Sequence, residues 1–442
     1  MATYKNLRKV LNLPTLSASP SSGVNGEMYF NTGDSALYIY DGAWKKVTQT
    51  AVPGPADWTA AAQQAKLVAS DAQTGDEFGY SVDISSDTLV VGAYKEDTGG
   101  TTAGAAYVFT RSGTSWSQQA KIQSSDVQAD DQFGRSVAID GDTMVAGAPN
   151  EDTGSSNAGA AYVFTRSGTT WSQQAKIQAS DAQASDFFGY GAVAIDGDTL
   201  VVGAFGEDTG GSSSGALYVF TRSGTSWSQQ AKLVASDAQA SDYLGRGFSI
   251  GISGDTVVAG AYREDAGGTD AGAAYVFIRS GTSWSQQAKL VASDAAAGDN
   301  FGNGTAISGN TVVVGASLKD TAGTDTGAVY VFTRSGTSWS QQAKLVAGNP
   351  SGLDEFGKSV DIDGDTVIIG ATKEDTGIQD TGAAYIFTRS GTTWSEQKLL
   401  KGSDVPAYKR FGWAVAIDGS TAVGTTKLID SNTGAAYTFL AG

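Results

Sequence analysis

A phrase close to GAAYVFTRSGTSWSQQAKL recurs along this chain, and each copy is preceded by a Phe-Gly pair or its equivalent. The spacing between successive pairs is 55 to 57 residues, and no unit contains a helical stretch. A period of this size, built only from strand-like segments, is typical of radial or stacked repeat folds. We therefore predict an all-β fold, a seven-bladed β-propeller. The seven pairs are Phe78-Gly79, Phe133-Gly134, Phe188-Gly189, Leu244-Gly245, Phe301-Gly302, Phe356-Gly357 and Phe411-Gly412.

Each unit contains four short segments rich in β-branched and aromatic residues, which predicts four-stranded blades. Asp-Gly or Ser-Gly pairs separate the first two segments, and such pairs favour the left-handed positions of a tight hairpin. In the first unit the predicted strands are Phe78 to Ile84, Thr88 to Ala93, Ala105 to Thr110 and, led in by residues 116–120, Lys121 to Ser124.

An Arg-Ser-Gly turn joins the third and fourth segments. In six units an Arg and a Trp stand five residues apart across this turn, from Arg111 and Trp116 to Arg389 and Trp394. We interpret them as a cross-strand packing pair, whose cation–π energy is about 0.5–1 kcal/mol when exposed. The six Arg residues are expected on the face of the ring opposite to its acidic loops.

The two ends of the chain predict how the ring closes. The last unit stops at Gly442 without a fourth strand, whereas Trp58 to Ser70 reproduces the fourth-strand phrase with no first strand before it. The strand near residues 58–70 should therefore complete the seventh blade. This gives two domains, an N-terminal module with its linker at 1–52 and the propeller at 53–442.

The units resemble FG-GAP repeats, the blades of integrin α-like propellers. The likeness rests on Phe-Gly-x-Ser-Val (Phe78 to Val82), Val-Val-Gly-Ala (Val90 to Ala93) and Gly-Ala-Ala-Tyr-Val-Phe (Gly104 to Phe109), and it spans residues 58–442. Many members of that family carry an Asp-rich calcium loop between the first two strands. Here that connection is only Ile139 to Thr143 or shorter, which is too short to supply about six oxygen ligands. We expect no cofactor, with calcium as the alternative left open.

Composition excludes several classes of function. The chain has 46 acidic and 29 basic residues, and the resulting net charge of −17 opposes binding of nucleic acid through its phosphates. It has no His and no Cys, and its Ser residues recur in turn phrases, so we expect no enzyme. No segment is long enough to span a membrane. The first 14 residues lack an apolar run of secretory-signal length.

Residues 26–47 predict a three-strand meander: Met28 to Asn31, Ala36 to Tyr40 and Trp44 to Val47. The segment resembles a small module of bacteriophage tail-fibre and other virion proteins, and Pro14 to Gly23 before it has the composition of a flexible spacer. A unit this small rarely holds itself together, so it should be stabilised by another copy or by a virion protein. The candidate anchoring residues are Tyr29, Phe30, Leu37, Tyr38, Tyr40 and Trp44.

A polar loop follows the second strand of every unit, on the face that also carries the connections between blades. We expect the acidic residues of these loops to form a circlet, and loops on a rigid scaffold are where binding sites are usually built. The alternative is a solvated face whose Asp residues make local turns. The candidate contact residues are Asp97, Asp152, Asp208, Asp265, Asp320, Asp375 and Asp430.

Together these features favour a structural protein of a bacteriophage virion, associated with the tail, fibre or collar and assembled in the host cytoplasm. Its expected partners are other virion proteins through the N-terminal module, a host-surface protein or glycan through the propeller, and further copies of itself. A bacterial surface or matrix adhesin, located at the cell surface, is the first alternative. A carbohydrate-active enzyme is the second.

Overall fold

The computed structural model describes residues 56–248, 250–375 and 379–442, together with the backbone of four short strands between residues 15 and 46. The chain divides into two compact units, Met1–Ala56 and Asp57–Gly442. In the first unit β1 pairs parallel with β2, and β2, β3 and β4 pair antiparallel in sequence order. The strands are β1 (Thr15–Leu16), β2 (Met28–Asn31), β3 (Ala36–Tyr40) and β4 (Trp44–Lys46).

This small sheet confirms the three meander strands but contains one more strand than the sequence predicted. Thr15 and Leu16, which fall within the predicted flexible spacer, pair with Phe30 and Asn31. The spacer prediction is therefore wrong at these two residues, because a Ser- and Pro-rich composition does not prevent two residues from adding to a free strand edge.

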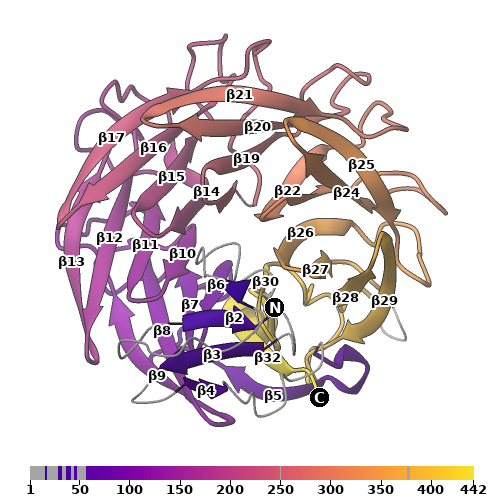
Figure 1. Cartoon of the computed structure of the whole chain (residues 1–442). Coiled ribbons are helices and arrows are strands. Elements are labelled where there is room, and N and C mark those ends of the chain that lie inside the picture. Colours follow the sequence, from indigo (N-terminus) through magenta and orange to yellow (C-terminus); the bar gives the residue numbers. More distant parts are fainter. Residues whose placement is uncertain are drawn as a thin grey trace. The chain divides into compact units, whose positions relative to one another are not determined.

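The second unit consists of seven four-stranded antiparallel sheets, as predicted. Figure 1 shows them arranged as the blades of a ring, with the first strand of each blade near the centre and the fourth on the outside. In chain order the blades are β6–β9 (Ser81–Ser85, Thr88–Ala93, Ala105–Ser112, Ser115–Ile122), β10–β13 (Val137–Asp140, Thr143–Ala148, Ala160–Ser167, Thr170–Ile177), β14–β17 (Phe188–Asp196, Thr199–Ala204, Ala216–Ser223, Ser226–Leu233), β18–β21 (Ile250–Ser253, Thr256–Ala261, Ala273–Ser280, Ser283–Leu290), β22–β25 (Phe301–Ser308, Thr311–Ala316, Ala328–Ser335, Ser338–Leu345), β26–β29 (Phe356–Asp363, Thr366–Ala371, Ala383–Ser390, Thr393–Leu400) and β30–β32 (Val415–Asp418, Thr421–Thr426, Ala435–Leu440) with β5 (Ala62–Leu67).

The fourth strand begins earlier than the sequence predicted. β9 starts at Ser115 and ends at Ile122, whereas the predicted strand is Lys121 to Ser124. The polar Ser-Gln-Gln segment is strand because it lies on the outer, half-solvated edge of the blade, where an apolar pattern is not required. The Arg–Trp prediction is confirmed: Arg111 and Trp116 are register partners, and the guanidinium carbon lies 5.3 Å from the ring centroid.

Adjacent blades meet backbone to backbone at the Phe-Gly pairs. Between the fifth and sixth blades, the Phe356 N–H donates to the Thr326 carbonyl at 3.1 Å, and Gly327 forms a parallel bridge with Phe356. The Phe356 ring is buried edge-on against Tyr385 and Phe387, with centroid distances of 5.3 and 6.0 Å. The recurring sequence unit therefore supplies both the strands of one blade and the backbone contact between neighbouring blades.

Hydroxyl groups brace the same joints from inside the ring. A Ser or Thr in or beside the first or second strand donates to the carbonyl of the next blade's Phe-Gly glycine. The pairs are Ser81 with Gly134 at 2.9 Å, Ser136 with Gly189 at 2.8 Å, Ser359 with Gly412 at 3.0 Å and Thr425 with Gly79 at 2.6 Å.

The seventh blade is closed by the N-terminal strand of the unit, as the repeat count predicts. β5 pairs antiparallel with β32, with Leu67 opposite Ala436. The Lys66 ammonium lies 2.6 Å from the Asp404 carboxylate, and Trp58 and Leu67 are buried. None of the helices in the described part of the chain is long and apolar enough to cross a membrane.

Candidate functional site

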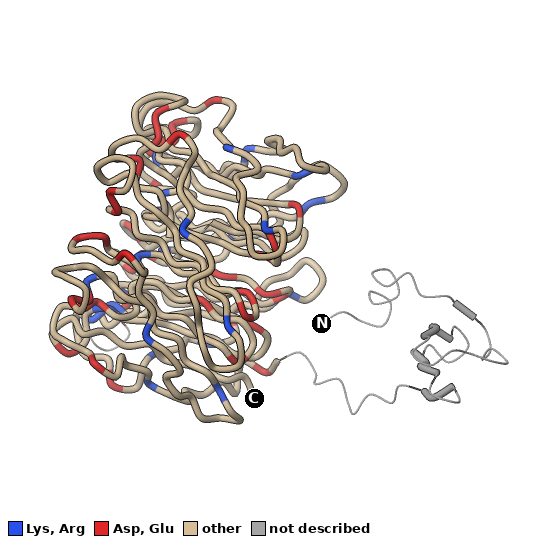
Figure 2. The backbone as a smooth tube through the Cα atoms, turned by 90° about the vertical axis from the view of Figure 1, so that its left-hand side faces the viewer, with Lys and Arg blue, Asp and Glu red and all other residues tan. Residues whose placement is uncertain are grey.

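The circlet aspartates are exposed, and six of them organise their own loops. Each of the six accepts a hydrogen bond from the backbone N–H five residues later. This is the local turn role named above as the alternative to a contact site. Figure 2 shows acidic residues concentrated in the loops on the left-hand side of the ring. The pairs are Asp97–Thr102, Asp152–Asn157, Asp208–Ser213, Asp265–Asp270, Asp320–Asp325 and Asp375–Asp380; Asp430 instead lies 3.7 Å from Lys66.

The glutamate that precedes the circlet aspartate is buried in the first four blades. In the first blade Glu96 is 1% exposed and accepts from Lys121 at 2.8 Å. Lys121 also donates to Asp71, at 2.6 Å, and so ties the loop between blades to the blade itself. Burial opposes ionisation of Asp71, but hydrogen bonds from Lys121 and Tyr107 outweigh it and hold the pKa of Asp71 below its usual value. Much of the acidic character of these loops is therefore structural.

The arginines on the opposite face are neutralised as well. Arg111 pairs with Asp87 at 2.7 Å while it packs over Trp116, and its side chain is only 15% exposed. Four further turn arginines pair with an Asp in the same way, and Arg334 bonds to Asn310. Five of the six turn arginines on this face therefore have their charge paired with an Asp.

The blades differ from one another in the residues that flank their first two strands, as well as in their loops. Three positions in each unit vary in chemical type while the surrounding phrase repeats. Before the Phe-Gly pair stand Glu77, Gln132, Phe187, Tyr243, Asn300, Glu355 and Arg410; directly after it stand Tyr80, Arg135, Tyr190, Arg246, Asn303, Lys358 and Trp413; after the second strand stand Tyr94, Pro149, Phe205, Tyr262, Ser317, Thr372 and Lys427. We call these residues, together with Phe248, Lys95, Arg263 and Lys373, the basin.

The basin is basic and aromatic in a strongly acidic protein. At the three variable positions alone, Glu77 and Glu355 are acidic and Arg135, Arg246, Lys358, Arg410 and Lys427 are basic, whereas the whole chain carries 46 acidic residues against 29 basic ones. The sequence does contain this signal, but only at the positions where the repeats differ, whereas the circlet was predicted from positions that recur. The basic members are Lys95, Arg135, Arg246, Arg263, Lys358, Lys373, Arg410 and Lys427.

Backbone strain accompanies the basin. All seven residues before the Phe-Gly pairs have positive φ, between 53° and 59°. Gly or Asn suits this conformation, yet only Asn300 among the seven is of that kind, and Phe187 and Tyr243 are bulky. Such strain costs about 1–2 kcal/mol per residue, and its recurrence in all seven units indicates that the joint between blades requires this conformation.

Arg135 and Arg246 are held by aromatic rings. The Arg135 guanidinium carbon lies 4.6, 4.6 and 4.1 Å from the ring centroids of Tyr80, Tyr94 and Tyr190. Arg246 lies 4.9 Å from the Phe205 centroid and donates to the Tyr262 hydroxyl at 2.7 Å. Among the described residues no carboxylate forms an ion pair with either arginine, so both retain an uncompensated charge in the basin.

The other half of the basin is internally paired. Lys427 lies 3.9 Å from the Trp413 centroid and 2.8 Å from Glu77, and Lys95 contacts Glu77 at 2.6 Å. Burial opposes ionisation of Glu77, but the hydrogen bonds from the two lysines outweigh it and hold its pKa below the usual value. Lys373 pairs with Glu355 at 2.7 Å.

An aromatic cluster of Phe248, Trp413 and Tyr80 adjoins a cavity of about 420 Å³, which Tyr80 and Phe248 help to line. Phe248 comes from the unit with the longest spacing, in which Leu244 replaces the Phe of the pair. Its ring centroid lies 5.5 Å from that of Trp413 and 6.4 Å from that of Tyr80, which belong to the seventh and first blades. The insertion thus brings a fourth-blade side chain into contact with the far side of the ring.

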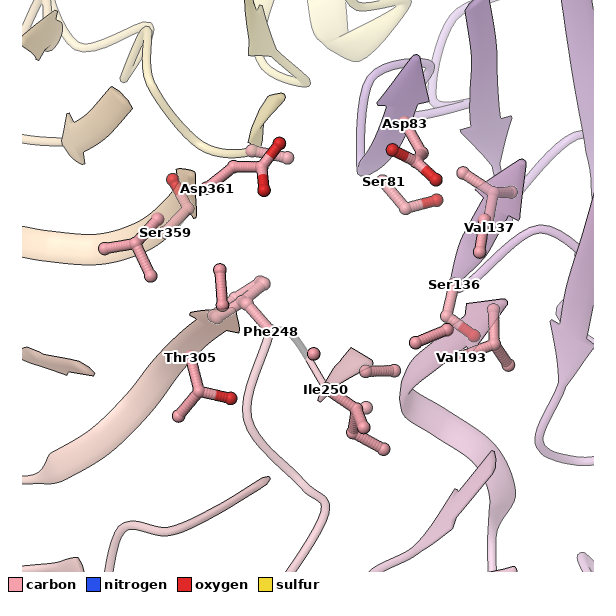
Figure 3. A pocket seen from close by; sticks show the side chains of 18 of the residues that line it. Ser81, Asp83, Ser136, Val137, Val193, Phe248, Ile250, Thr305, Ser359 and Asp361 are labelled. Carbon is pink, nitrogen blue, oxygen red and sulfur yellow. The ribbon is translucent and has the colours of Figure 1, made fainter. Parts of the chain in front are cut away.

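Two carboxylates face this cavity. Figure 3 shows Asp83 and Asp361 on different strands, directed into the pocket. Each accepts a backbone N–H from the next blade, Asp83 from Ile139 at 2.7 Å and Asp361 from Ile417 at 2.8 Å. Burial and then the charge of Asp361 raise the pKa of Asp83 to about 8, and burial raises the pKa of Asp361 to about 6. The equivalent residues in the other blades are Ala138, Ala194, Gly251, Ala306 and Ala416.

Stability should fall as pH rises from 7 to 9. A folded-state pKa of about 8 for Asp83 exceeds its unfolded value of about 4, so the folded protein binds more protons in this window and loses stability as they dissociate. The chain has no His or Cys to mask the effect. We expect D83N/D361N to abolish most of the drop in melting temperature between pH 7 and 9. The control D152N/D208N replaces two exposed carboxyl groups and should retain the drop; equal slopes in the two variants would contradict the assignment.

No cluster of three or more metal-ligating side chains occurs among the residues that the structure describes. The candidate anchoring residues are placed as backbone only: Tyr29 pairs with Tyr38, Phe30 with Leu37, and Tyr40 with Trp44. Their side chains lie outside the described part of the structure, and the anchoring role stays a prediction.

A family model described as FG-GAP repeat matches the chain seven times and covers well over half of it. Each match starts in or directly before the fourth strand of one blade and ends in the third strand of the next, so the sequence repeat spans a blade boundary. The matched residues are 61–109, 116–164, 171–220, 227–277, 284–332, 339–387 and 394–439.

Among solved structures, a chain titled "Crystal Structure of Mitotic Checkpoint Complex" is similar to this one. The alignment has a TM-score of 0.50 and 13% sequence identity, and it covers 90% of this chain and 99% of the other. At this identity the likeness concerns the fold alone. No curated protein matches the sequence.

Proposed function

The chain belongs to the FG-GAP repeat family, and on that premise we propose that its ring is an adhesion scaffold that binds a partner through the basin. One observation carries the proposal: the repeats preserve their framework but differ at the basin positions. A purely structural ring would gain from an Asn or Gly at the strained positions, yet bulky and charged residues such as Phe187, Tyr243 and Arg410 stand there.

We further propose that the N-terminal unit attaches this scaffold to a bacteriophage particle, whose partner then lies on the host surface. The support is the resemblance of residues 26–47 to a tail-fibre module and the pairing of β2, β3 and β4 as a small meander. A four-stranded sheet of so few residues gains stability from a partner surface, which favours assembly with virion proteins or with further copies of the chain.

Adsorption to bacterial cells tests the proposal. Particles or purified full-length chain should adsorb to cells of the host strain, and R246Q/K358Q should reduce adsorption at least about tenfold, because charge-assisted contacts are among the strongest at an interface. Removal of residues 1–56 should release the chain from particles but leave adsorption of the free propeller intact.

The comparison variant changes all seven circlet aspartates to Asn. Each Asn oxygen can still accept the backbone N–H of its loop, so folding should be preserved. If this variant loses adsorption while R246Q/K358Q retains it, the contact lies on the circlet and the basin is not the binding site. If the particles never contain the chain, the virion assignment is refuted, while the proposal that the basin binds a partner still stands.

A further inference from the structure

We propose that the basin recognises the carboxylate of an acidic sugar, of uronic or sialic type, with the Arg135 and Arg246 guanidinium groups set among half-buried aromatic rings. The inference rests on the proposed function and names the ligand class of the same site.

The arginines of this protein provide an internal comparison. At the hairpin turns Arg111 and Arg166 each pair with an Asp at 2.7 Å. In the basin, Arg135 and Arg246 have no carboxylate partner among the described residues, although the chain has 46 acidic residues. Arg135 also has a buried Nε without a hydrogen-bond partner. Arginine is the side chain best suited to bidentate binding of a carboxylate, so an unpaired and preoriented one is a ready site for an external carboxylate.

Aromatic rings fix the planes of these two groups in advance. Tyr190 lies 4.1 Å from Arg135, and Phe205 and Tyr243 lie 4.9 and 4.8 Å from Arg246. Stacking restricts the arginine rotamers before the ligand arrives, which lowers the entropic cost of binding. The basin therefore offers two oriented charges with apolar ring surface beside them.

The combination favours a sugar acid over an acidic peptide. A uronic or sialic acid carries its carboxylate on a ring, and the C–H groups of that ring pack against the negative face of an aromatic side chain. An Asp or Glu side chain in a peptide carries its carboxylate on a flexible arm and would leave the aromatic surface unused. Nucleic acid is disfavoured by the net charge of −17.

The test is a binding titration of the full-length chain with defined oligosaccharides. The panel contains oligogalacturonate, oligoglucuronate and sialyl-lactose, each with its carboxyl methyl ester as the neutral partner, and a poly-Glu peptide. We expect binding of at least one acidic sugar, at least tenfold weaker binding of its ester, and loss of about tenfold or more in affinity for R246Q. Sensitivity to ionic strength should accompany the binding.

R334Q is the matched control. Arg334 bonds to Asn310 on the turn face, so its removal deletes the same charge without leaving an unpaired Asp, and sugar affinity should change less than about twofold. Equal binding of acids and esters, no binding across the whole panel, or binding of poly-Glu alone would overturn the inference. Cell adsorption that depends on the basin but ignores the acidic sugars would leave the adhesion proposal standing and remove only this ligand class.

Discussion

Deletion of residues 1–70 should open the ring, whereas deletion of residues 1–56 should leave its stability nearly unchanged. The longer deletion removes β5 and with it the strand pairing to β32, the buried Leu67 and Trp58 side chains and the Lys66–Asp404 ion pair. Each buried side chain is worth about 2–5 kcal/mol and each strand hydrogen bond about 1 kcal/mol. We expect the melting temperature to fall by roughly 10 °C or more.

Leu67 and Ala69 also belong to the core shared by the seventh and first blades, with Phe78 and Tyr107. Loss of β5 therefore exposes the β32 edge and loosens the neighbouring blade, and the truncated ring should aggregate. A peptide of residues 57–70 added in trans should restore part of the stability, because strand addition supplies the missing pairing. The same peptide with L67K is the control. Equal melting temperatures of the two truncated chains would mean that β5 does not close the ring.

The sequence predicted the ring well because the repeat carries several independent constraints. The Phe-Gly spacing determined the number of blades, and the missing fourth strand at Gly442 determined the closure. The fourth strand of the first blade was predicted too late in the sequence, because Ser115 to Gln119 lacks apolar alternation. This segment forms a strand through its pairing with β8 beside it. Strands on an outer edge are specified by their neighbours more than by their own composition.

The circlet as a contact site stays a prediction, and the basin was not predicted from the sequence, for a physical reason. The circlet aspartates were chosen because acidity recurs in the loops, but the glutamates beside them proved to be buried partners of lysines such as Lys121 and Lys176. Recurrence in a repeat protein marks what every blade needs to fold. The basin residues Arg135, Arg246 and Phe248 stand at positions where the repeats differ, and only closure of the ring brings such positions from separate blades together.

We expect the fold to require a glycine mainly where a Cβ atom would collide with the next blade. A left-handed backbone conformation alone should matter less. Three glycines of the fifth blade separate the two effects. Gly327 has φ of +85° and a Cβ there would lie 2.0 Å from the Phe356 carbonyl oxygen; Gly315 lacks positive φ, but its Cβ would lie 2.0 Å from the Gly357 oxygen; Gly336 has φ of +63° and open space around it.

Replacement of each by Ala should therefore give an ordered series of stabilities. G336A introduces left-handed strain only and should cost about 1–2 kcal/mol. G315A forces two blade backbones apart and should cost about 3 kcal/mol or more, and G327A should cost the most, because it combines both effects. Chemical denaturation of the full-length chain measures the series, and near-ultraviolet circular dichroism shows whether each variant has folded. If G315A is harmless while G327A and G336A are equally damaging, backbone strain alone explains these glycines and the blades can separate to admit a methyl group.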